Sequence, residues 1–142
     1  MKYELLYDEF KKEIPECEDF CVAKEKENAV HPTDDGMHII FGMVVVPYIL
    51  HEVVERRDTE KINKIFEFLE KMAKSQNTSI QEVLEFSIIE AFIAEGREKL
   101  QLLKKYMHDE TLECCKHQEQ YFVIGSQYDL MHNWNPLDPL LL

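Results

Sequence analysis

The stretch from Thr78 to Gly96, TSIQEVLEFSIIEAFIAEG, constrains the fold more than any other part of the chain. At the step of about 100° per residue of an α-helix, one broad face of this stretch is apolar, and further apolar residues lie on the opposite side. A helix that is apolar on two faces is buried between neighbouring elements. The sequence therefore predicts an all-α domain built around this helix. The broad face holds Ile80, Val83, Leu84, Ser87, Ile88 and Ala91, and the opposite side holds Phe86, Ile89 and Ile93.

Both ends of this helix carry recognisable residues. Thr78 and Gln81 have the spacing of a capping box, which satisfies two free backbone N–H groups. Gly96 suits the position just after the helix, where glycine adopts a left-handed backbone.

Glu90 lies within the apolar surface of the predicted helix. A carboxylate in that position needs partners or a shifted pKa. We expect a buried structural carboxylate, hydrogen-bonded to a Tyr, Lys, Arg or backbone N–H. The alternative is a catalytic or ligand-binding acid.

Shorter helical patterns flank the central helix. Apolar residues recur at helical spacing in 1–14, 16–28, 59–74, 97–107 and 110–122. We therefore predict one all-α domain, either a compact multi-helix bundle or a short stack of helical hairpins. It divides into acidic N-terminal helices at 1–35, a helical core at 43–122 and an irregular C-terminal tail at 123–142.

Two segments leave alternatives open. The β-branched and aromatic residues of 37–45 suit a short buried strand, or an extended lead-in to a helix that begins near Met43 and has Pro47 in its first turn. The tail is too apolar to remain in water, with Trp134 and three terminal leucines. We expect it to dock on its own domain, and docking on another subunit is the alternative.

The net charge of −12 and the pI of about 4.9 restrict the partners. Binding to nucleic acid or to an anionic membrane needs clustered Lys and Arg, so we expect neither partner. The N-terminus lacks the apolar core of a signal peptide, and Gly42 and Pro47 interrupt the longest apolar run. We expect a cytoplasmic protein with reduced cysteines.

The acidic excess is concentrated at the N-terminus, where residues 1–35 hold eleven acidic and five basic side chains. An acidic surface steers a basic protein partner toward it. We therefore predict a partner-binding surface in this segment, formed by exposed charges at Glu13, Glu16, Glu18, Asp19, Asp34 and Asp35.

Cysteine and histidine offer a second possible chemistry. Cys17 and Cys21 are spaced to share one helix face, and His108 and His117 flank the adjacent Cys114 and Cys115. Neither cysteine pair has the usual knuckle spacing of a zinc site, and acidic neighbours disfavour a thiolate nucleophile beside His117. We expect structural thiols, no metal and no cofactor.

Four segments resemble a family of uncharacterised bacterial helical proteins, several of which occur beside polymorphic toxins and are treated as immunity proteins. These segments are IIFG at 39–42, KIFEFLEKMAKS at 64–75, IQEVLEFSIIEAF at 80–92 and KKYMHDETLECC at 104–115. The resemblance covers a little over half of the chain and consists mainly of packing positions. Met43 departs from it, because the family has an acidic residue after the Phe-Gly pair.

The resemblance implies a helical fold and a toxin domain as the partner. Together with the acidic surface, it favours a non-enzymatic interaction protein that binds and neutralises a basic toxin. One alternative is a small enzyme or metal-binding protein that uses Glu90 or the Cys and His residues. Another is a structural domain that self-associates through its C-terminal tail.

Overall fold

The computed structural model describes the backbone of residues 1–132 and the side chains of residues 1–121. Short 3-10 and π-helical segments (η) join the α-helices end to end, so that this part of the chain forms seven helices and no strand. The all-α prediction is confirmed. The elements are η1 Tyr3–Leu5, α1 Leu6–Glu13, η2 Pro15–Cys17, α2 Glu18–Glu27, α3 Met37–Ile40, η3 Phe41–Val45, α4 Val46–Leu50, η4 His51–Arg56, α5 Thr59–Ala73, α6 Thr78–Glu82, η5 Val83–Ile89, α7 Glu90–Ala94, α8 Arg97–Lys104 and α9 Asp109–His132.

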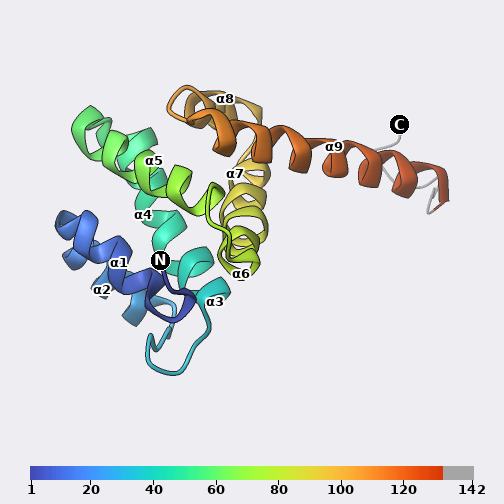
Figure 1. Ribbon diagram of the computed structural model, residues 1–142. Helices are drawn as coiled ribbons and strands as arrows, with labels where there is room; N and C mark the ends of the chain where they lie inside the picture. The colour runs from blue at the N-terminus through green and yellow to red at the C-terminus, as the bar shows by residue number, and fades with distance from the viewer. Residues whose placement is uncertain (133–142) are drawn as a thin grey trace.

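The helices pack around one hydrophobic core (Figure 1). The α6–η5–α7 helix lies at the centre of these contacts. Its η5 segment packs against α3, η3, α5 and α9. A hydrogen bond of 2.6 Å between His38 and Ser87 links α3 to η5. On the N-terminal side, Phe10 of α1 contacts Phe41, Tyr48 and Phe68 edge to face. This ring cluster joins α1 to η3, α4 and α5.

The predicted central helix is present and largely buried. The side chains of Ile80, Val83, Leu84, Ile88, Ile89 and Phe92 are all within the core. Phe86 is an exception, because 50% of it is exposed although the helical wheel places it against a neighbour. Residues Val83–Ile89 are wound as a π-helix, which advances by a smaller angle per residue than an α-helix. A wheel drawn at about 100° per residue is therefore wrong in this segment and beyond it.

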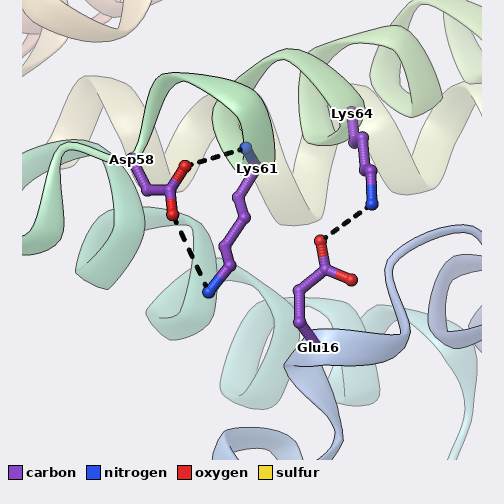
Figure 2. Close-up of polar contacts among 4 residues, drawn as sticks. All are labelled: Glu16, Asp58, Lys61 and Lys64. Atoms are coloured by element: carbon purple, nitrogen blue, oxygen red, sulfur yellow. Dashed lines mark hydrogen bonds and ion pairs between the residues drawn. The ribbon is translucent and has the colours of Figure 1, made fainter.

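The ends of the helices use partly different caps from those predicted. Asn77, and not Thr78, caps α6 by accepting a 2.9 Å hydrogen bond from the N–H of Ser79. Gly96 has φ = +104°, so the predicted need for glycine at this turn is confirmed. Asp58 caps α5 through the N–H of Lys61, and its carboxylate also faces the Lys61 ammonium (Figure 2).

Residues Met37–Arg56 form one continuous helix, so both alternatives for 37–45, the strand and the extended lead-in to a helix near Met43, are wrong. Pro47 follows the π-helical segment Phe41–Val45, where the hydrogen-bond register changes and the missing proline N–H is tolerated. By length and mean hydropathy of 1.8, this helix could cross a membrane, and 56% of the window is buried inside the fold. Burial of this kind is also found in the core helix of a domain with no membrane contact.

Helix α9 continues to His132, beyond the predicted end at Phe122. It starts against α5 and η5 and then extends away from the other helices (Figure 1). Trp134 and the terminal leucines, for which docking is predicted, lie outside the described residues.

Candidate functional site

Of the six carboxylates predicted to form the acidic N-terminal surface, three make hydrogen bonds within the fold and three are exposed without such a bond. Lys71 donates a 2.7 Å hydrogen bond to Glu13, and Lys64 donates a 3.1 Å hydrogen bond to Glu16 (Figure 2). Both lysines belong to α5, so these two carboxylates hold the N-terminal helices against the core. Asp35 accepts a 2.7 Å hydrogen bond from the N–H of His31 within its own turn.

The other three predicted residues, Glu18, Asp19 and Asp34, are exposed. Ion pairs described for residues 1–121 involve none of them. About half of the predicted surface is thus available to a partner, and the other half contributes to the fold.

A second acidic surface, which the sequence reasoning missed, lies between α5, the α6–η5 segment and α9. It is a groove of about 300 Å³, called here the acidic groove. Glu85 approaches from η5, and Glu110 and Glu113 approach from the first turns of α9. No Lys or Arg lines the groove among the described residues. The remaining lining residues are Ala73, Gln81, Leu84, Cys114 and His117.

Glu70 fixes the shape of the acidic groove by binding the start of α9. Its carboxylate accepts hydrogen bonds from the N–H of Glu110 at 3.1 Å, from the N–H of Thr111 at 2.8 Å and from the Thr111 hydroxyl at 2.9 Å. The first N–H groups of a helix have no partner within the helix, and a carboxylate there also interacts favourably with the helix dipole. Asp109, directly before the predicted helix at 110–122, is the first residue of α9.

Burial raises the pKa of Glu70, but the hydrogen bonds from Thr111 and Glu110 and the charge of Lys74 outweigh it, so the net pKa is lowered. Only 6% of Glu70 is exposed, although charged residues of a helix usually lie on its solvated face. Glu70 follows the buried Phe66 by four residues and so shares its helix face, which is the sequence signal for its burial.

Glu90 lies at the edge of the core, half-buried, rather than inside it. The hydrogen bonds described for residues 1–121 do not involve its carboxylate. The π-helical segment that precedes Glu90 rotates it out of the apolar surface where the wheel placed it. Among residues 1–121, the buried carboxylates are Glu70 and Glu52, and Glu52 has one oxygen without a hydrogen-bond partner there.

The cysteines are buried or half-buried, as expected for structural thiols. Cys17 and Cys21 are adjacent, and the hydrogen bond between them, followed by burial, raises the pKa of Cys17. Cys114 lines the acidic groove together with His117, but burial and the charge of Glu85 raise its pKa to about 12. A thiol with that pKa is almost entirely protonated at neutral pH and is a poor nucleophile.

Neither cysteine pair is part of a recognisable metal centre in the described part of the chain. No three His, Cys, Asp or Glu side chains there are close enough to share an ion.

Comparison with known proteins gives one match. A family model described as a domain of unknown function, DUF7674, matches residues 7–122. No curated protein and no solved structure matches the chain.

Proposed function

The chain thus belongs to the DUF7674 family, which has no assigned function, and we propose that it is a non-enzymatic interaction protein that binds a basic protein partner in the acidic groove. The matched residues 7–122 include every described residue that lines this groove. The proposal depends mainly on the single sign of charge around the groove.

Two features of the acidic groove suit a basic side chain. Glu85, Glu110 and Glu113 surround it, and Ala73 and Leu84 supply apolar surface below. A Lys or Arg from a partner would place its aliphatic stem on the apolar surface and its charge among the carboxylates. Lys116 pairs with Glu113 at 3.7 Å, but both side chains are exposed, so this ion pair contributes little.

The state of the thiol in the groove supports binding over catalysis. Nucleophilic catalysis by Cys114 would need an electropositive setting that lowers its pKa. The carboxylate of Glu85 has the opposite effect.

We further propose that the partner is a basic toxin domain and that the protein neutralises it, acting in the cytoplasm. Support for this finer function comes from the family resemblance at 39–42, 64–75, 80–92 and 104–115 and from the net charge of −12. An acidic protein associates quickly with a basic one because long-range attraction steers their encounter.

The test uses a toxin domain encoded next to this gene and measures its affinity for the full chain by biolayer interferometry. The Glu85→Gln/Glu113→Gln variant removes two charges from the acidic groove. The control variant, Glu18→Gln/Asp19→Asn, removes two charges from the N-terminal surface. We expect the groove variant to bind at least about tenfold more weakly, or about 1.4 kcal/mol, and the control to bind as the wild type does.

Each other outcome has a distinct meaning. If only the control variant binds more weakly, the N-terminal surface is the contact and the acidic groove is not. If no adjacent toxin binds, or if the bound toxin remains fully active, the immunity function is wrong.

A further inference from the structure

The outer face of the Met37–Arg56 helix is an apolar stripe that no other described part of the chain covers completely. Ile39 is 45% exposed and Met43 is 43% exposed, and Pro47, Leu50 and Val54 continue the stripe half-buried. The helix has π-helical turns at Phe41–Val45 and His51–Arg56, but a step of three or four residues is close to one turn in either winding, so the five residues stay on one side. A contiguous apolar stripe of this kind marks a contact surface more often than scattered exposed residues do.

The stripe deepens into a groove around Leu50, called here the apolar groove, with a volume of about 430 Å³. Phe20 of α2 forms one wall and is stacked on His51 at 4.9 Å between ring centroids. Pro47, Leu50 and Val54 form the floor. The rim carries charges of both signs: Lys24 pairs with Glu27 at 3.1 Å, Lys99 pairs with Glu95 at 3.4 Å, and Glu55 also lines the groove.

The C-terminal segment 133–142, NWNPLDPLLL, has the composition that suits the apolar groove. It contains one tryptophan and four leucines but no Lys or Arg. Pro136 and Pro139 disfavour a helix and favour an extended segment, the form in which proline-rich segments dock against aromatic walls.

The reach of the chain determines whose groove this segment can occupy. Helix α9 has 24 residues and is therefore about 36 Å long. It carries the chain away from α5 and α8 (Figure 1). Ten further residues span at most about 36 Å when fully extended, so they can barely return to the start of α9. Residues of α2, α4, η4 and α8 line the apolar groove, and α2 and α4 lie on the other side of the start of α9 from its far end (Figure 1).

We propose that residues 133–142 of one copy occupy the apolar groove of a second copy, so that the protein associates with itself. This contact is separate from the acidic groove and does not depend on the proposed function. It gives the apolar stripe a specific occupant, because Trp134 and the leucines cover residues that are otherwise exposed to water.

Trp134 allows a direct test, because it is the only tryptophan in the chain. Its emission and its quenching by acrylamide are measured on the full chain over a range of protein concentrations, together with the molar mass by light scattering. We expect blue-shifted, protected emission and a dimer or larger assembly at high concentration. Dilution should shift the emission to the red and reduce the mass to that of one chain.

Substitution in the apolar groove locates the contact. Val54→Glu places an unpaired charge on the floor and should weaken self-association at least about tenfold, with earlier loss of Trp134 protection on dilution. Phe86→Glu is the matched control, because Phe86 is apolar and exposed but outside the groove. It should leave association unchanged. Circular dichroism of both variants verifies that each is folded.

Three results would overturn the proposal. Trp134 emission typical of full exposure at every concentration would show that nothing covers the segment. Protected emission from a monomer, unchanged by dilution, would show docking within one chain. Equal effects of Val54→Glu and Phe86→Glu would place the contact elsewhere.

Discussion

The carboxylate of Glu70 accepts hydrogen bonds from both the N–H and the hydroxyl of Thr111, although the two residues are 41 positions apart in the chain. A helix start is normally capped by a residue next to it in sequence. In this protein a different helix provides the cap, so the local stability of α9 depends on the packing of α5.

Glu70→Ala should lower the free energy of unfolding by about 1.5–3 kcal/mol, because it removes charge-assisted hydrogen bonds and leaves buried N–H groups without partners. Urea denaturation at pH 7 measures the change. Glu67→Ala serves as the control, since Glu67 is exposed on the same helix and should change stability by less than about 0.5 kcal/mol. Equal losses in the two variants would mean that the α9 cap contributes nothing measurable.

The lowered pKa of Glu70 predicts a specific pH dependence. A carboxyl group whose pKa is lower in the folded state stabilises the protein above its unfolded pKa of about 4.3, and this contribution is lost as the pH falls through the folded pKa. Glu70→Gln cannot titrate. The stability difference between wild type and Glu70→Gln should therefore be largest near pH 7 and should narrow below about pH 4, as measured by urea midpoints across this range.

Leu84→Ala should cost about 2–5 kcal/mol, because Leu84 is buried in the central helix and its removal leaves a cavity. Phe86→Ala, two residues along the same helix, should cost far less, since half of Phe86 is exposed. Thermal and urea unfolding of both variants compare them directly. A larger loss for Phe86→Ala would show that the π-helical winding of Val83–Ile89 is absent.

The ion pairs between the N-terminal helices and α5 should each contribute about 0.2–1 kcal/mol. A double-mutant cycle on Glu13→Gln and Lys71→Met measures the coupling energy of the pair that is 2.7 Å apart. The coupling should decrease as NaCl rises from 0.05 to about 1 M, because salt screens exposed charges. Zero coupling at low salt would assign Glu13 to the open acidic surface instead.

The thiol groups should react slowly in the folded protein. At pH 8, a pKa of about 12 leaves Cys114 with roughly a thousandfold less thiolate than an unperturbed cysteine with a pKa of about 8.5. Cys17, Cys21 and Cys115 are fully buried and should react only after unfolding. Labelling with iodoacetamide, with mass spectrometry to identify each site, measures these rates, and fast labelling of Cys114 in native protein would contradict the raised pKa.

The sequence predicts the helical fold well because the apolar spacing of α5 and of Thr78–Ala94 directly reflects what the core buries. It does not predict the exposure of Phe86 or the position of Glu90, because both depend on π-helical turns that have no distinct composition. The continuous Met37–Arg56 helix is missed for a related reason: Pro47 indicates the first turn of a helix, and the π-helical segment that precedes it has no distinct composition.

The candidate site was less predictable than the fold. Counting charges along the chain identifies residues 1–35 as acidic, but it cannot show that Glu13 and Glu16 are paired with lysines of α5. The acidic groove combines Glu85 with Glu110 and Glu113, which are distant in sequence and are brought together only when Glu70 holds α9 in place.

Glu70 also controls the direction of α9, because it binds only the first turn of this long helix. Because α9 is held at its first turn and is about 36 Å long, a tilt of about 5° at Thr111 moves the far end by about 3 Å. A weakened cap would therefore change the direction of the far end of α9 much more than it would change the core. In this way one buried carboxylate sets both the shape of the acidic groove and the direction of a long helix.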